Sequence, residues 1–180
     1  MAMKPLSLET IARVTGGTLI GGDPETLITG VFRDNREIIP GGLFLCIPGS
    51  RVDGHDFCGA AYDAGAAACM GQRELSDLAG PYILVDSTLE ALKALGKYYR
   101  GLFDIPIIGV TGSVGKTTAK EMTAAALSAK YNVFKTPANL NNEIGVPLSL
   151  LSMEEEHQAA VIEMGISDFG EMSRLADMVR

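Results

Sequence analysis

Histidine and cysteine are scarce in this sequence: its 180 residues include two histidines and three cysteines, Cys46, Cys58 and Cys69. The number of cysteines is odd and no Cys-x-x-Cys pair occurs, which favours reduced thiols in a cytosolic protein over a disulfide framework. Neither His55 nor His157 pairs with a cysteine at the spacing of metal ligands. A zinc site is therefore not expected.

Long apolar runs and blocks of basic residues are missing as well. No run approaches the roughly 20 apolar residues that a membrane-spanning helix needs, and no long apolar segment follows the first residues, so no secretory signal is visible. The net charge is -7 and lysine and arginine do not cluster, which argues against a nucleic-acid partner. With 47% hydrophobic and 21% charged residues, the composition is ordinary for a soluble globular protein.

The first 85 residues alternate short strand and helix patterns. A helix is predicted over residues 7–17, because Ser7 can cap it and Gly16-Gly17 can stop it. Strands are predicted at 18–20, 27–32, 43–47, 66–70 and 82–85, and a helical segment at 55–65. We interpret residues 1–85 as a small α/β domain.

A connecting helix is predicted at residues 86–103. Ser87-Thr-Leu-Glu90 matches a capping box, in which the serine oxygen and the glutamate side chain each take a free backbone amide. From there to Gly101, apolar residues recur at helical spacing.

The second domain is predicted from residue 104 to residue 180. Strand patterns lie at 105–110, 132–135 and 159–164, and helix patterns at 116–130, 145–151 and 170–179. This alternation indicates a parallel sheet with right-handed crossovers. The fold class is therefore α/β, a small first domain followed by a parallel-sheet P-loop domain. Three strands are few for a triphosphate-binding sheet, so we expect the sequence to be the front part of a longer polypeptide.

The segment Ile107-Ile-Gly-Val-Thr-Gly-Ser-Val-Gly-Lys-Thr-Thr118 predicts a phosphate site. An apolar strand leads into a glycine loop, whose backbone amides can converge on phosphate oxygens at a helix N-terminus. Lys116 can neutralise the β- and γ-phosphates, and the Thr117 hydroxyl can ligate Mg²⁺. The loop is shorter than the general Gly-x-x-x-x-Gly-Lys-Ser/Thr pattern, since Val110 stands where the first glycine would. The alternative, a plain strand–turn–helix connection, is disfavoured because Lys-Thr-Thr follows the strand. The predicted nucleotide-binding residues are Gly112, Ser113, Val114, Gly115, Lys116, Thr117 and Thr118.

Glu163 closes the apolar run 159–163 with a carboxylate. Ligand groups lie at the carboxyl ends of strands in parallel sheets, so Glu163 could meet a Mg²⁺ held by Thr117. An ordinary charged residue at a strand exit fits the pattern equally well.

Two further polar segments have a plain and a functional interpretation. Asn139-Leu-Asn-Asn142 is explained by turn chemistry alone, or by amides that line a site beside the phosphate loop. In the first domain, Arg36 of Asp34-Asn-Arg36 could clamp a diphosphate bidentately, and Arg51-Val-Asp-Gly-His-Asp-Phe57 could receive a polar head group. On the residues alone, turn chemistry is favoured for the Asn-rich segment, and a turn plus a surface helix cap is favoured for the segments of the first domain.

Together these segments resemble the Mur ligases, the ATP-dependent enzymes that add amino acids to the bacterial cell-wall precursor. Residues 111–121 resemble the phosphate loop and following helix of that family, and residues 139–147 resemble its Asn-rich loop. Residues 40–44 and 53–57 resemble its UDP-binding first domain. The resemblance spans nearly the whole chain, and the motifs occur in the order of the family.

The resemblance implies a cytoplasmic, monomeric bacterial ligase of peptidoglycan synthesis. It implies that ATP and Mg²⁺ serve to join UDP-N-acetylmuramoyl-tripeptide and D-alanyl-D-alanine through an acyl phosphate. The resemblance further implies that Lys116 and Glu163 are catalytic residues and that Thr117 and Glu163 are metal ligands. The residues implied to contact the UDP-sugar are Asn35, Arg36, Asp53, Gly54, His55, Asn139 and Asn142. The 180-residue chain by itself is expected to be inactive.

Two positions depart from the family pattern. Asn35 stands where the family often has Ser or Thr, and Ser167-Asp168 stands where many relatives show Asn-His, although Asp168 could still coordinate a hard cation.

Three rival functions stay open for this sequence. One is a sister Mur ligase that adds the third amino acid, which usually has Asn at the place of Val114. A P-loop kinase or GTPase is the second, and a UDP-binding module without catalysis is the third.

Overall fold

The structure is a computed structural model that describes residues 3–49 and 52–180. Arg51, which opens the motif at 51–57, lies outside the described residues. The chain forms two compact units, Met1–Leu95 and Gly96–Arg180. The boundary between them falls inside the helix predicted as a connector. Binding of a UDP-sugar by the first unit and of a nucleotide by the second stays a prediction.

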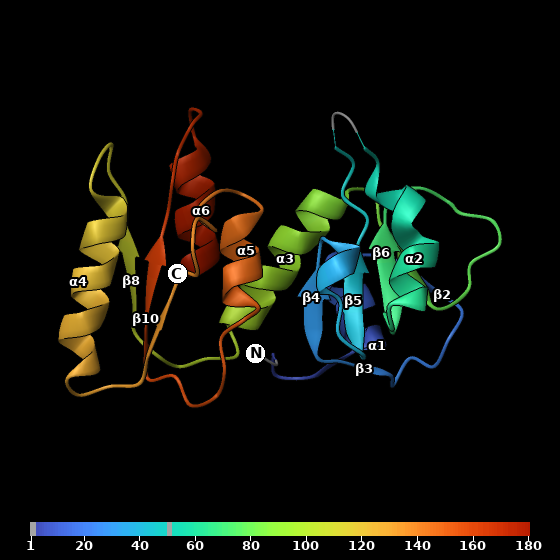
Figure 1. Cartoon of the computed structure of the whole chain (residues 1–180), viewed down its shortest axis with the longest axis horizontal. Coiled ribbons are helices and arrows are strands. Elements are labelled where there is room, and N and C mark those ends of the chain that lie inside the picture. The colour runs from blue at the N-terminus through green and yellow to red at the C-terminus, as the bar shows by residue number, and fades with distance from the viewer. Residues whose placement is uncertain (1–2, 50–51) are drawn as a thin grey trace. The chain divides into compact units, whose positions relative to one another are not determined.

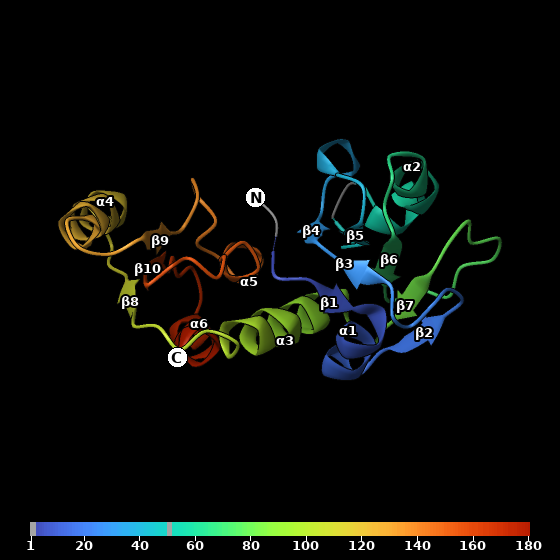
Figure 2. The same cartoon turned by 90° about the horizontal axis from the view of Figure 1, so that it is seen from below.

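The first unit is built on a five-stranded sheet with the order β2-β7-β6-β5-β4. Its strands are β2 (Thr18–Ile20), β4 (Gly30–Phe32), β5 (Gly42–Leu45), β6 (Ala68–Gly71) and β7 (Tyr82–Leu84). Strands β4 to β7 pair in parallel, and β2 joins β7 in the antiparallel sense. Helices α1 (Leu8–Thr15) and α2 (Cys58–Asp63) lie on opposite sides of this sheet (Figure 2). Buried side chains of β5, β6 and β7 form the core.

The single strand predicted at residues 27–32 is wrong. The chain forms two strands there, β3 (Leu27–Ile28) and β4, which belong to different sheets. Strand β3 pairs with β1 (Leu6–Ser7), which was not predicted, whereas β4 pairs with β5. The break at Thr29 lets the chain change partners, and its amide donates to the Gly41 carbonyl instead (3.1 Å). The helical segment predicted from residue 55 opens as a 3-10 helix, Gly54–Phe57, before α2 begins.

The predicted helix ends are largely confirmed. Ser7 caps α1 by accepting the Thr10 amide (3.2 Å), and Gly16 ends it at φ 66°, in the left-handed region that favours glycine. Helix α3 (Thr88–Arg100) begins as the capping box predicts, with the Glu90 amide donating to Ser87 Oγ (3.3 Å). The Glu90 carboxylate, however, accepts a hydrogen bond from Lys93 at 2.9 Å, so the second half of the box is replaced by a side-chain pair.

The second unit has a three-stranded parallel sheet with the order β8-β10-β9, as predicted from the alternating pattern. Its elements are β8 (Ile107–Val110), α4 (Lys116–Ser128), β9 (Val133–Lys135), α5 (Gly145–Leu150), β10 (Ala159–Glu163) and α6 (Glu171–Val179). Helix α4 covers one face of the sheet, and α5 and α6 lie on the other side (Figure 1). The register places Glu163 beside Val110, so β8 and β10 end at the same edge.

The structure bears on two of the features that are scarce in the sequence, the cysteines and the long apolar runs. The three cysteines are free and buried, and the Sγ atoms of Cys46 and Cys58, 3.1 Å apart, share a thiol hydrogen bond and no disulfide. Over residues 3–49 and 52–180, no helix has the length and apolar character to cross a membrane.

Candidate functional site

The phosphate loop lies between β8 and α4 in the second unit. Gly112 (φ 148°) and Gly115 (φ 75°) adopt positive φ angles, which a side chain would strain. The first hydrogen bond of α4 joins the Ala119 amide to the Gly115 carbonyl (2.9 Å), which leaves the amides of the first turn without an acceptor inside the helix. Lys116 Nζ folds back to donate to the Gly112 carbonyl (2.8 Å). Free amides, the positive helix end and an ammonium group thus converge, as anion binding requires.

The sheet brings Thr117 and Glu163 together, as predicted from the strand pattern. The Thr117 hydroxyl donates to Glu163 Oε1 at 3.4 Å. The other carboxylate oxygen, Oε2, is buried and accepts no hydrogen bond from the described residues. Hydroxyl and carboxylate oxygens are the donors that Mg²⁺ prefers, and this ion keeps several ligands from water and phosphate. The two residues therefore fit Mg²⁺ bound together with a nucleotide, whereas the described part of the chain has no cluster of three or more His, Cys, Asp or Glu able to hold a metal.

Three residues around Glu163 were missed by sequence reasoning. Lys120 is only 2% exposed, and its Nζ lies 3.3 Å from Glu163 Oε2. Asn141 Nδ2 donates to Glu163 Oε1 (2.9 Å), and the Glu163 amide donates to Thr136 Oγ1 (2.8 Å). Burial raises the pKa of Glu163, but the Asn141 hydrogen bond and the Lys120 cation outweigh it, so its pKa lies below the usual range. The spacing of Lys120, four residues after Lys116 on one helix, was the available signal.

The Asn-rich loop is placed beside this site by Asn141 rather than by the two asparagines predicted there. Asn142 Oδ1 accepts the amides of Ile144 (3.2 Å) and Gly145 (2.7 Å), so its side chain supports the start of α5. Asn139 is exposed, and its carbonyl accepts the Asn141 amide (2.9 Å). The turn interpretation explains Asn142 in this structure, and a contact of either residue with a UDP-sugar stays a prediction.

Asp168 lies in the loop between β10 and α6. Its Oδ1 accepts the neighbouring Phe169 amide at 2.6 Å, and its own amide donates to Glu171 Oε2 at 3.2 Å. These are turn contacts, and coordination of a second cation by Asp168 stays a prediction.

The first unit holds a separate pocket of about 500 Å³. Two short segments and β5 contribute its lining residues: Arg33, Asp34, Asn35, Arg36, Phe44, Ile47, Val52, Gly54 and Phe57. Asn35, Arg36 and Gly54 line this pocket, and their predicted contact with a UDP-sugar stays a prediction. Val52 and Phe57, from the motif at 51–57, add exposed apolar side chains. A mixed apolar and cationic lining of this size suits a nucleoside with attached phosphate.

Arg36 is oriented by its neighbour Asp34. Its Nε and Nη2 donate to the two carboxylate oxygens of Asp34 at 2.9 and 2.6 Å. Hydrogen bonds from the Arg36 side chain and backbone amide lower the pKa of Asp34 to about 2. Asp34 thus occupies the Nε and Nη2 edge of the Arg36 guanidinium. Only the remaining N–H groups of Arg36 are left to donate to a diphosphate, as the predicted bidentate contact requires.

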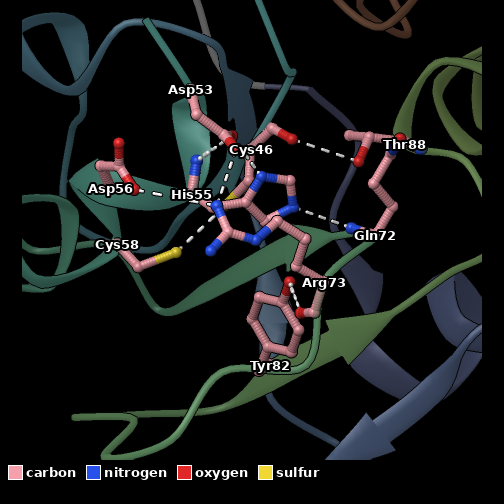
Figure 3. Close-up of polar contacts among 9 residues, drawn as sticks. All are labelled: Cys46, Asp53, His55, Asp56, Cys58, Gln72, Arg73, Tyr82 and Thr88. Carbon is pink, nitrogen blue, oxygen red and sulfur yellow. Dashed lines mark hydrogen bonds and ion pairs between the residues drawn. The ribbon is translucent and has the colours of Figure 1, made fainter.

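Asp53 and His55 form a partly buried network and do not line this pocket (Figure 3). Asp53 accepts the His55 amide (3.0 Å), His55 Nδ1 (2.5 Å) and Arg73 Nη1 (2.7 Å). His55 Nε2 accepts the Gln72 amide at 2.9 Å, which assigns the proton to Nδ1. The His55 side chain is fully buried and both ring nitrogens are engaged, so this geometry holds the loop that carries Gly54 and Phe57 and argues against direct ligand contact by His55.

Gly71 offers a test of how tightly this network is packed. A Cβ at Gly71 would lie 2.4 Å from Tyr82 Oη and 2.6 Å from His55 Nε2, whereas a Cβ at Gly59 on α2 would meet nothing within 4 Å. We expect Gly71→Ala to destabilise the protein by about 2 kcal/mol through overpacking. The matched control Gly59→Ala should be neutral or stabilising by about 0.5 kcal/mol, because a helical glycine loses more chain entropy. Urea unfolding followed by circular dichroism measures both, and equal effects would contradict the packing.

Comparison with known proteins matches this chain in both units. The description "Mur ligase middle domain" fits residues 110–180, and "Mur ligase family, catalytic domain" fits residues 27–100. The UDP-N-acetylmuramoyl-tripeptide–D-alanyl-D-alanine ligase of Bacillus subtilis (strain 168) is 44% identical over 177 residues, which cover 95% of this chain and 39% of that protein.

Solved structures agree with the sequence comparison. MurF from Acinetobacter baumannii superposes with a TM-score of 0.93 at 33% identity, over 99% of this chain and 40% of that one. MurF ligase from Thermotoga maritima, solved in complex with ADP, superposes with a TM-score of 0.76 at 36% identity, over 83% of this chain and 35% of that one. The chain thus spans about two fifths of the length of the relatives it matches. With both units matched in order, this chain belongs to the Mur ligase family.

Proposed function

We propose that this chain carries the nucleotide site and the UDP-sugar site of an ATP-dependent amide ligase, which joins D-alanyl-D-alanine to UDP-N-acetylmuramoyl-tripeptide. The observation that carries the proposal is the meeting of Lys116, Thr117 and Glu163 at one sheet edge. The separate pocket with Asn35 and Arg36 in the first unit supports it, because such a ligase must hold two nucleotides. The names of the relatives support the choice of substrates.

The proposed reaction forms and breaks bonds in two steps. An oxygen of the tripeptide carboxylate attacks the γ-phosphorus of ATP, which releases ADP and leaves an acyl phosphate. The amine of D-alanyl-D-alanine then attacks the acyl carbon, loses a proton to solvent, and the tetrahedral intermediate expels phosphate as the amide forms. The first step requires an anionic carboxylate to approach a polyanionic triphosphate.

The chain's own residues offset this repulsion. The Lys116 ammonium and the amides of the first turn of α4 would bind and orient the phosphates in line with the carboxylate. Thr117 and Glu163 would hold Mg²⁺, which supplies positive charge to the phosphate oxygens when it is bound. We also propose that the full-length protein is cytoplasmic and monomeric, and sedimentation of the full-length protein would check the monomeric state.

The UDP part of the proposal predicts the effect of Arg36→Ala. Losing one charge-assisted hydrogen bond to a diphosphate should weaken UDP binding about tenfold. Arg13→Ala removes the same charge from the exposed last turn of α1, away from the pocket lining, and should leave the affinity unchanged. Isothermal titration of the full-length protein with UDP makes the measurement, and equal affinities in the two variants would contradict the placement of UDP.

Product analysis separates the proposal from its rivals. The full-length protein is supplied with ATP, Mg²⁺, UDP-N-acetylmuramoyl-tripeptide and D-alanyl-D-alanine, and mass spectrometry follows the UDP-sugar. Addition of the dipeptide supports the proposal. In a parallel reaction that supplies a UDP-sugar with a shorter peptide and single amino acids, addition of one amino acid indicates the sister ligase. A phosphorylated hydroxyl in either reaction indicates a kinase. In a separate titration, UDP binding without ATP binding indicates a non-catalytic module.

A further inference from the structure

Lys120 is a buried cation that the proposed reaction does not use. It lies in the first half of α4, four residues after the phosphate-loop lysine, and is 2% exposed. Its Nζ donates to the backbone carbonyls of Thr136 (3.1 Å) and Ala138 (3.5 Å), besides its contact with Glu163 Oε2 at 3.3 Å. Burying an ammonium group costs desolvation free energy unless such partners surround it. The contacts of Lys120 offset that cost, which raises the question of what they do for the protein.

The two carbonyls belong to the loop that leads from β9 into the Asn-rich segment. Ala138 adopts φ 43°, a backbone conformation that residues other than glycine rarely take. Two short-range backbone hydrogen bonds continue the turn: the Leu140 amide donates to the Pro137 carbonyl (3.2 Å), and the Asn141 amide donates to the Asn139 carbonyl (2.9 Å). The strained turn is therefore held from one side by Lys120.

Glu163 and Asn141 hold the same loop from the other side. Asn141 Nδ2 donates to Glu163 Oε1 (2.9 Å), and the Asn141 carbonyl accepts the Gly165 amide just after β10 (2.7 Å). Helix α4 packs against β9 and β10, and Lys120 Nζ reaches from this helix to the Thr136 and Ala138 carbonyls just after β9. One ammonium group thus connects the helix of the phosphate loop, the Glu163 carboxylate and the Asn-rich loop.

We infer that Lys120 is a positioning residue that ties the loop 136–142 and the Glu163 carboxylate to the phosphate-loop helix. Its task is to set the place of the Asn-rich segment relative to the nucleotide site. The identity of the ligands on either side rests on the proposed function, whereas the positioning itself rests on the contacts of Lys120.

Hydrogen–deuterium exchange of the full-length protein tests the positioning without any need for activity. In Lys120→Met, which keeps the length of the side chain, the amides of Leu140 and Asn141 should exchange at least about tenfold faster, while α4 and the sheet of the first unit stay within about twofold. Lys130→Met is the matched control, because Lys130 is an exposed lysine just after α4. Unchanged exchange in the loop, or faster exchange throughout the chain, would overturn the inference.

A second variant covers the case in which Lys120→Met fails to fold because Glu163 is left buried without a cation. The double variant Lys120→Met/Glu163→Gln removes both charges, which buried pairs tolerate better than the loss of one. The carbonyls of Thr136 and Ala138 still lack their donor, so the loop should still exchange faster than in Glu163→Gln alone. Equal exchange in these two variants would show that the loop does not depend on Lys120.

Kinetics distinguish positioning from phosphate binding. Lys120→Met should raise the KM for the UDP-sugar about tenfold and leave the KM for ATP within about twofold. A raised KM for ATP with an unchanged KM for the UDP-sugar would make Lys120 a phosphate ligand and overturn the inference. If the wild-type protein shows no ligase activity, the proposed function fails, and the exchange measurements still decide the role of Lys120.

Discussion

Replacing Lys116 with alanine in the full-length protein is expected to lower kcat about a hundredfold or more. The ammonium group lies over the phosphate loop, where its Nζ contacts the Gly112 carbonyl, and in the proposed reaction it meets the charge that develops on the transferred phosphate. The backbone amides of the loop remain in the variant, so binding of ADP should persist while turnover is lost.

The measurement for Lys116→Ala is the steady-state release of phosphate, with ADP affinity measured in parallel. Lys130→Ala serves as the matched control, because it removes an exposed lysine charge outside the loop. Near-normal turnover in Lys116→Ala would remove Lys116 from the catalytic residues. Loss of ADP binding together with turnover would point to a collapsed loop instead of a lost transition-state contact.

Glu163→Gln is expected to affect both metal dependence and stability. As the only carboxylate beside Thr117 Oγ1 within hydrogen-bond reach among the described residues, Glu163 should carry much of the affinity for Mg²⁺, and its loss should raise the Mg²⁺ requirement of turnover about tenfold or more. The same change removes the buried carboxylate 3.3 Å from Lys120 Nζ and leaves only the half-exposed Glu121 carboxylate, at 3.6 Å, as an anionic partner, which should destabilise the second unit by about 3 kcal/mol.

The two effects of Glu163→Gln separate in a mutant cycle with Lys120→Met. Stability should recover in the double variant, because no unpaired buried charge remains, but the Mg²⁺ requirement should stay high. Glu156→Gln is the control: Glu156 is an exposed carboxylate in the segment between α5 and β10, and its loss should change little. A normal Mg²⁺ requirement in Glu163→Gln would refute its assignment as a metal ligand.

The elements that carry the nucleotide site could be predicted from the sequence because local rules determine them. An apolar run, a loop with two glycines at positive φ and a helix that begins at Lys116 are short-range features. The edge where Thr117 meets Glu163 follows from the parallel order of the strands, which the alternation of strand and helix predicts. Strand β1 and the break at Thr29 were missed, because a strand of two residues gives no periodic signal.

The side-chain environment could not be predicted, because it depends on contacts between distant parts of the chain. Lys120 is a helical lysine to which the sequence analysis gave no role, yet it is buried against carbonyls 16 and 18 residues further on. His55 lies in a motif that suggested ligand contact, but the Gln72 amide, 17 residues away, takes its free nitrogen. Asn35 and Arg36 line the pocket, while its apolar lining comes from a strand and loops that share no sequence pattern, and UDP contact by either residue stays a prediction.

The central claim, that a carboxylate is activated by ATP before the amide forms, is tested most directly with an isotope. UDP-N-acetylmuramoyl-tripeptide labelled with ¹⁸O in its terminal carboxylate is given to the full-length protein with ATP, Mg²⁺ and D-alanyl-D-alanine, and the released phosphate is analysed by mass spectrometry. Activation through an acyl phosphate predicts one ¹⁸O atom in the phosphate for each amide formed, because the carboxylate oxygen that attacked the γ-phosphorus leaves with it. Phosphate without the label would contradict the account, since its fourth oxygen would then have come from water.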